Sequence, residues 1–276
     1  MSIDPPPPPR RKSNDNSPVA RGAALVDDLV MGLRFFSRLP LGDRPHQRPD
    51  LNRIALALAF TSLAIGIGPA LLLTGASWLG LPSFFAAALA VAALVIVTGA
   101  MAEDGLADAA DGLFGGGSAE RRLEILRDSR HGTYGVCALC LLLLLRVAGL
   151  GAVAAFNPLA AGGLWLAAMV LSRSAALWLT VALPPARADG AAAGAGRVTR
   201  QNFAVGAVFA VILGFVLAAP FAGILGFALA LLLAAGVVFG WTQLCSRLVG
   251  GQTGDLIGAL QALLEIAALT AFLLFA

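Results

Sequence analysis

The chain has 276 residues, of which 58% are hydrophobic and only 13% are charged. Soluble domains carry about 25% charged residues, so this composition excludes an ordinary soluble domain and predicts an integral membrane protein. The formal net charge of +3 does not indicate nucleic-acid binding, because the Lys and Arg residues outside the apolar stretches lie in the N-terminal segment and in three short segments: 103–133, 184–202 and 242–255.

The N-terminal segment 1–24 contains five consecutive prolines and lacks the apolar core of a signal peptide. Its composition predicts a disordered cytoplasmic tail. Residues 25–276 are then a single transmembrane domain. Within it, residues 25–40 carry apolar side chains at helical spacing, which is typical either of an amphipathic helix on the membrane surface or of an extension into the first span.

Long apolar stretches follow, and about 20 apolar residues suffice to cross a bilayer. No Asp, Glu, Lys or Arg occurs in 54–102 or in 201–246, so each stretch has room for two spans, with turns at Pro82 and Pro220. The predicted spans are 54–78, 83–102, 134–156, 159–183, 203–219, 221–241 and 256–276.

The basic residues all fall on one side of these spans, which by the positive-inside rule is the cytoplasmic side. The predicted fold is therefore an all-α transmembrane bundle of about six to seven spans with a cytoplasmic N-terminus. Seven spans place the C-terminus on the opposite side, whereas one re-entrant segment leaves six and keeps it inside.

The acidic segment 103–112 directly follows the second predicted span. If the helix continues, Asp104, Asp108 and Asp111 lie within about 60° of one another on one face. Carboxylates this close raise one another's pKa unless a cation lies among them. Mg²⁺ suits such oxygen ligands and fills its other positions with water and substrate phosphate. The pattern predicts a metal site, and a solvated helix end is the alternative.

A polar helix over 119–130 is expected next. It places four arginines beside the acidic segment: Arg121, Arg122, Arg127 and Arg130. Guanidinium groups bind phosphate oxygens in pairs, so an arginine cluster beside a metal site fits a diphosphate substrate. Ordinary positive-inside anchoring is the alternative for each of these arginines.

Two further arginines, Arg146 and Arg173, fall inside predicted spans. A mid-membrane Arg costs at least about 2.5 kcal/mol on insertion scales, so each must face protein or a polar cavity. For Arg146, pairing with an acid such as Glu265 and contact with substrate both remain open. The segment 250–255, with three glycines and Asp255, is expected to close the cytoplasmic pocket from the opposite side.

Three segments together resemble the hallmark motifs of the cobalamin synthase family, the adenosylcobinamide-GDP ribazoletransferases: EDGLADAADG (103–112), RRLEILRDSRHGTYG (121–135) and GGQTGD (250–255). The resemblance covers about residues 30–276. It departs at Ala102, where many relatives have a His, so no metal or proton-transfer role of that His is carried over. His131 is not offered as a substitute.

The resemblance implies a Mg²⁺-dependent transferase that attaches α-ribazole, or its 5′-phosphate, to adenosylcobinamide-GDP and releases GMP. The implied partners are these two substrates and the lipid bilayer of the bacterial inner membrane, with the site facing the cytoplasm and a homo-oligomer possible. The implied site residues are Asp104, Asp108 and Asp111 for metal and catalysis, and Arg127, Arg130, Arg173 and Asp255 for substrate.

Two rival classes share part of the pattern. CDP-alcohol phosphotransferases carry D-x-x-D-G-x-x-A-R, whose first half matches 108–112, but Gly115 and Gly116 stand where Ala and Arg belong. A corrinoid permease is the non-catalytic alternative. Transporters often contain internal repeats with polar breaks near the midplane, whereas this chain has no evident repeat and gathers its polar residues at the cytoplasmic ends of its spans.

Overall fold

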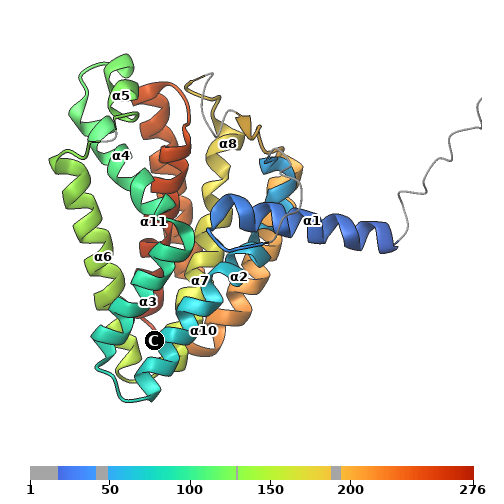
Figure 1. Cartoon of the computed structure of the whole chain (residues 1–276), viewed down its shortest axis with the longest axis vertical. Coiled ribbons are helices and arrows are strands. Elements are labelled where there is room, and N and C mark those ends of the chain that lie inside the picture. Colours follow the sequence, from blue (N-terminus) through green and yellow to red (C-terminus); the bar gives the residue numbers. More distant parts are fainter. Residues whose placement is uncertain (1–17, 42–48, 129, 188–193) are drawn as a thin grey trace, which may run out of the picture.

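The structure is a computed structural model that describes residues 18–41, 49–128, 130–187 and 194–276 (Figure 1). Over these ranges the predicted all-α class is confirmed, since the sole β-type pairing is an isolated bridge between Pro185 and Gln252. The helices are α1 (Pro18–Phe36), α2 (Leu51–Trp78), α3 (Ser83–Thr98), α4 (Met101–Gly115), α5 (Ala119–Ile125), α6 (Thr133–Ala154), α7 (Pro158–Ala176), α8 (Trp178–Ala182), α10 (Arg200–Val249) and α11 (Gly254–Leu273).

Several helices are long and apolar enough to cross a membrane. Among the described residues, five pass by length and composition, namely α2, α6, α7 with α8, α10 and α11. The pair α3 and α4 becomes a sixth if it is taken as one bent span. On α6, Leu141, Leu144 and Leu145 are all exposed, and such a surface is matched to lipid tails, not to water.

The predicted pair of spans in 203–241 falls within α10, a run of 50 residues in which two helices meet at one non-helical residue. A straight helix of that length is about 75 Å long, more than twice a bilayer core of about 30 Å. Phe215 and Phe227 are about 18 Å apart along a straight helix, yet their ring centroids lie 5.3 Å apart. The chain therefore folds back on itself between them.

The reversal takes place at Gly223 and not at Pro220, where the sequence predicted it. Gly223 has φ 66° and ψ −177°, a conformation that glycine adopts at little cost. Pro220 lies inside the helical run. The second arm extends to Val249, so the predicted loop 242–255 shrinks to the few residues before α11.

The second predicted span does not continue into the acidic segment, which corrects the sequence-based expectation. α3 ends at Thr98, and Gly99 and Ala100 both adopt left-handed backbone with φ 64° and 59°. α4 then leaves at an angle of 87° to α3. Phe84 of α3 contacts Gly151 near the end of α6, whereas the end of α4 contacts the start of α6. The bent pair therefore runs the length of α6 in the opposite direction.

Two other predicted elements need correction. The expected polar helix over 119–130 is short, because α5 ends at Ile125. α1 is separate from α2, so it does not extend into the first span; in Figure 1 it crosses the bundle at a steep angle. Asp28 of α1 holds it to the start of α2, accepting from Arg53 Nη2 at 2.6 Å.

The chain passes through the bundle seven times if α3 with α4 counts as one passage, α7 with α8 as one and α10 as two. The starts of α2 and α11 and both ends of α10 then lie at one end of the bundle, with α5 and α8 (Figure 1). Which end faces the cytoplasm stays a prediction. Residues 1–17 of the expected tail lie outside the described residues, and α1 begins inside the tail's predicted range.

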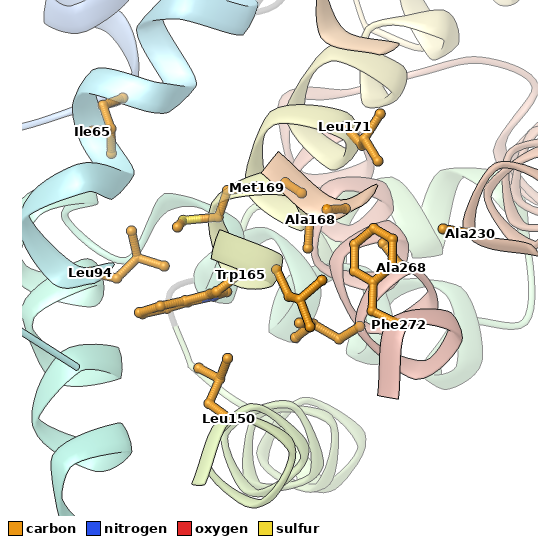
Figure 2. Packing of buried hydrophobic residues seen from close by; sticks show 14 of the residues in the cluster. Ile65, Leu94, Leu150, Trp165, Ala168, Met169, Leu171, Ala230, Ala268 and Phe272 are labelled. Carbon is orange, nitrogen blue, oxygen red and sulfur yellow. The ribbon is translucent and has the colours of Figure 1, made fainter. Parts of the chain in front are cut away.

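The core is built around Trp165 of α7, which has no exposed surface. Figure 2 shows its ring between Leu94 of α3 and Leu150 of α6, with Met169 one turn further along α7. Burying a large aromatic side chain of this kind is worth roughly 3 kcal/mol or more. This packing fixes α3, α6 and α7 beneath the end of the bundle where α4 begins.

Candidate active site

A cavity of about 280 Å³ opens at the end of the bundle where α2 and α11 begin. Its walls come from the C-terminal end of α1, the bend between α3 and α4, and the first two turns of α11. The side chains that line it are apolar (Phe35, Phe36, Leu51, Met101, Leu177 and Ile257) and polar or charged (Arg38, Thr98, Asp104, Asp255 and Gln261). The structure thereby brings together segments from both ends of the sequence.

Asp104 and Asp255 share this cavity because α4 and α11 cross at very close range. A Cβ placed on Gly105 would lie 2.8 Å from the carbonyl oxygen of Asp255 and 3.2 Å from Cα of Gly258. Only glycine at 105 permits that approach. Of the segment 250–255, Gly254 and Asp255 line the cavity together with Asp104; that the segment closes a cytoplasmic pocket stays a prediction.

Asp255 is held in place by its neighbours. Its Oδ2 accepts hydrogen bonds from Arg187 Nη2 at 3.1 Å and from Thr253 Oγ1 at 3.2 Å. Thr253 also caps α11, accepting from Leu256 N. Asp104, by contrast, is exposed to the cavity. The two carboxylates thus differ, since one is tied to an arginine and the other is open to a ligand.

Asp108 lies one turn further along α4 and has 17% of its side chain exposed. Its Oδ1 is 4.0 Å from Nδ1 of His131. The carboxylates of Asp104 and Asp255 are close enough to repel the negative charge of Asp108. Asp104, Asp108 and Asp255 therefore form one acidic group, in which His131 is a neighbour that the sequence did not single out.

Asp111 faces elsewhere, although it lies on the same helix. Its carboxylate accepts hydrogen bonds from the backbone N–H groups of Gly132 at 2.6 Å and Gly135 at 2.9 Å, and it is buried. A carboxylate at a helix start satisfies unpaired N–H groups and complements the helix dipole. Asp111 thus caps α6 and does not line the cavity.

No group of three or more His, Cys, Asp or Glu side chains in the described ranges is arranged to hold a metal ion. Mg²⁺ does not require one, because it is usually bound through one or two carboxylates, with water and substrate phosphate completing its octahedron. The hard oxygen donors of Asp104, Asp108 and Asp255 fit that chemistry. The predicted trio with Asp111 is not assembled around one point.

Arg127 and Arg130 lie between α5 and α6, and neither lines the cavity. Arg130 is 86% exposed and its Nη2 donates to Asp128 Oδ2 at 2.7 Å. Hydrogen bonds from Arg130 lower the pKa of Asp128 to about 2. The structure therefore places these arginines outside the cavity, in the segment that leads from α5 to His131 and α6.

A buried charge cluster lies below the cavity. Arg146 Nη2 donates to Glu265 Oε2 at 2.7 Å, its Nη1 pairs with Glu103, and Trp165 Nε1 donates to Glu265 Oε1 at 2.9 Å. Of the two alternatives left open for Arg146, the structure shows the pairing with Glu265. Because breaking a buried ion pair costs about 3–5 kcal/mol, this cluster ties α4, α6, α7 and α11 together.

Arg173 of α7 lies near this cluster but forms no hydrogen bond with it in the described part of the chain. Its side chain is 3% exposed, and its Nε and Nη1 are buried without a partner there. Its guanidinium lies 5.8 Å from the ring centroid of Phe36. A space of about 10 Å³, next to the larger cavity, is lined by Arg173, Phe36 and Gln261. Arg173 is thus a buried cation behind the cavity wall.

Sequence reasoning missed four residues of this region: Arg38, Glu103, Arg187 and Gln261. Arg38 and Gln261 lie within the range of the family resemblance, about residues 30–276, but outside its three hallmark segments. Glu103 carried a signal, because it opens the acidic segment at a predicted membrane boundary, where an acid needs a partner. Nothing in the sequence marked Arg187, because its pairing with Asp255 joins the segment after α8 to the distant first turn of α11.

The fold and the cavity define an α-helical membrane protein with an acidic, arginine-flanked site at one end of its bundle. The sequence model of the family described as "Cobalamin-5-phosphate synthase" matches residues 28–273, and the chain belongs to this family. No solved structure matches the chain significantly.

Curated relatives extend over nearly the whole chain. A protein of Azorhizobium caulinodans named adenosylcobinamide-GDP ribazoletransferase is 46% identical, with 93% of this chain and 98% of the relative covered. A protein of the same name from Xanthobacter autotrophicus is 47% identical over 91% and 97% of the two chains. One from a Sinorhizobium species is 41% identical over 90% and 96%.

Proposed function

We propose that this protein is an adenosylcobinamide-GDP ribazoletransferase, which carries out the last assembly step of the cobalamin nucleotide loop. Family membership over residues 28–273 and relatives of that name at 41–47% identity support the activity. The observation that carries it is the cavity, where α4 and α11 present Asp104 and Asp255 to a space open at the bundle end.

The reaction exchanges one P–O bond for another. A ribose hydroxyl of the acceptor attacks the phosphorus that carries cobinamide, and the new P–O bond forms as the bond to GMP breaks. GMP leaves with that electron pair as a phosphate, so no strong general acid is required. The hydroxyl proton passes to a carboxylate, and Asp104 is the acceptor we assign because it faces the cavity and pairs with no basic side chain among the described residues.

Mg²⁺ is the proposed cofactor, held by Asp104 and Asp108 of the acidic group. When bound, the ion neutralises charge on the diphosphate of the donor. The protein's own part is to keep these carboxylates at the cavity edge, through the close crossing of α4 and α11. Asp255, already paired with Arg187, is assigned to substrate positioning.

The arginines outside the cavity are assigned to the nucleotide. The donor, a corrinoid joined to GDP, is far larger than the cavity, so most of it must lie beyond the bundle end. Arg127 and Arg130 lie outside the cavity, in the segment between α5 and α6 that also carries His131, and guanidinium groups suit a diphosphate. The protein is proposed to lie in the bacterial inner membrane with its site facing the cytoplasm. Whether it forms a homo-oligomer is left open.

The test is an assay on detergent-solubilised protein that measures GMP released from adenosylcobinamide-GDP. Release is expected only when both α-ribazole, or its 5′-phosphate, and Mg²⁺ are present. Chelation of the metal should abolish release, and Mg²⁺ added back should restore it. GMP release that needs no acceptor nucleoside would point to a hydrolase and contradict the proposal.

A further inference from the structure

The two substrates differ greatly in size, and the cavity has the size of the smaller one. Its volume of about 280 Å³ corresponds to roughly nine water molecules at about 30 Å³ each. A two-ring base joined to one ribose fits a space of that order. A corrin macrocycle with its side chains and GDP does not.

The wall that α1 contributes suits a planar aromatic base. Phe35 and Phe36 both line the cavity, with ring centroids 4.8 Å apart at an interplanar angle of 76°. Leu177, between α7 and α8, and Ile257 of α11 complete the apolar part. Aromatic and aliphatic surfaces bind a flat apolar ring well, whereas a diphosphate gains nothing from them.

The opposite wall suits a sugar. Asp104 and Asp255 accept hydrogen bonds when ionised, and Gln261 both donates and accepts. Ribose hydroxyls donate to carboxylates, while phosphate oxygens would be repelled by them. Arg38 also lines the cavity, and its side chain packs over Gly99 without an ion pair to any described residue. A 5′-phosphate on the sugar would therefore meet a cation there.

We infer that this cavity is the binding site of the acceptor nucleoside, with the benzimidazole base against Phe35 and Phe36 and the ribose toward Asp104 and Asp255. The corrinoid-GDP donor stays outside, with its reacting phosphorus at the cavity mouth. The inference rests on the proposed function, because it divides that reaction's two substrates between two places.

The experiment fills the cavity without touching its acids. Leu177→Trp adds bulk at a lining position, and Leu144→Trp is the matched control, because Leu144 lies on α6 and is 65% exposed. Calorimetry on the full chain in detergent measures binding of α-ribazole and of adenosylcobinamide-GDP separately. Leu177→Trp should weaken α-ribazole binding by at least about tenfold, the scale of overpacking a filled site, and leave donor binding within about twofold.

A second variant keeps the inference testable if Leu177→Trp fails to fold. Phe35→Leu removes one ring at the cavity wall and should weaken α-ribazole binding about two- to tenfold, the range expected for an aromatic contact, without changing donor binding. The inference is overturned if the affinity for α-ribazole is the same in the variants as in the wild type, or if the affinities for both substrates fall equally.

Failure of the inference and failure of the proposed function give different results. Wild-type protein that binds α-ribazole in this cavity but never releases GMP would contradict the proposed function alone. GMP release with α-ribazole binding that neither Leu177→Trp nor Phe35→Leu alters would contradict the inference alone.

Discussion

At the scale of single residues, one short acidic helix serves two purposes. Asp104 faces the cavity, Asp108 lies in the acidic group beside His131, and Asp111 turns to the start of α6. Three carboxylates at helical spacing thus have three different environments. The chemistry of each carboxylate follows from its neighbours on other helices.

Asp104→Asn keeps the shape of the side chain and removes its charge. We expect turnover to fall by at least about 10²-fold, the loss typical when a preorganised electrostatic partner is removed. Glu120→Gln, on exposed α5, is the control and should retain nearly full activity. Rates of GMP release at saturating Mg²⁺ measure both, and a near-normal rate for Asp104→Asn would remove its assigned role.

Asp111→Ala should act on stability first. Loss of the two hydrogen bonds from Gly132 and Gly135 leaves both N–H groups without their cap, and that of Gly135 is buried. Loss of a helix cap costs about 0.5–2 kcal/mol. The thermal unfolding midpoint in detergent should therefore drop for Asp111→Ala and stay unchanged for Asp104→Ala. An unaltered midpoint combined with lost activity would instead favour a metal-binding role for Asp111.

At the scale of helices, the site depends on how closely α4 approaches α11. The contact of Gly105 with Gly258 and with the backbone of Asp255 sets the position of both acidic side chains. The left-handed pair Gly99 and Ala100 sets the direction in which α4 leaves α3. Together these features turn the acidic segment across the bundle end.

Gly105→Ala should disturb this arrangement, because the added Cβ meets backbone atoms that cannot swing aside. The expected cost is about 1–3 kcal/mol of stability, together with a fall in kcat. Gly117→Ala is the matched control, since a Cβ there meets nothing within 4 Å. Thermal unfolding midpoints and initial rates are measured for both variants. If Gly105→Ala and Gly117→Ala give the same midpoint and the same rate, the close crossing of α4 and α11 is unimportant.

At the scale of the whole molecule, the chain passes through the bundle an odd number of times, seven. The start of α2 and the end of α11 therefore lie at opposite ends of the bundle. α5, which Ser118 caps, and the start of α11 at Gly254 lie at the end that holds the cavity, and the link between α6 and α7 that contains Phe156 lies at the other. The acidic group lies at the cavity end, the buried cluster around Arg146 lies deeper in the bundle, and the lipid-facing surface of α6 is apolar. The arrangement matches a protein whose polar chemistry takes place at one membrane face.

Labelling of single cysteines tests this topology. In a background without Cys137, Cys140 and Cys245, Ser118→Cys and Gly254→Cys should react with a membrane-impermeant reagent only from the cytoplasmic side. Phe156→Cys, with 93% of its side chain exposed in the wild type, should react only from the opposite side. Labelling of Ser118→Cys from outside intact cells would overturn both the orientation and a cytoplasmic site.

The sequence by itself determined the class of the molecule. Long charge-free stretches leave no alternative to membrane helices, because unpaired charge and open backbone are too costly in lipid. The helical class and the family followed from local pattern and motif, and the cost of a charge in lipid indicated that Arg146 needs protein or a polar cavity around it. These features depend on residues that are near one another in the chain, or on the free-energy cost of placing a single charged residue in lipid.

Only the tertiary structure decided how the site is assembled. Left-handed backbone at Ala100 broke a helix that the pattern predicted to continue, because an alanine gives no local sign of that conformation. The turn of α10 lies at Gly223. The hydrogen bonds by which Asp111 caps α6 and the pairing of Arg187 with Asp255 join different segments of the chain. Such contacts depend on the distance between packed helices, which hydropathy does not encode.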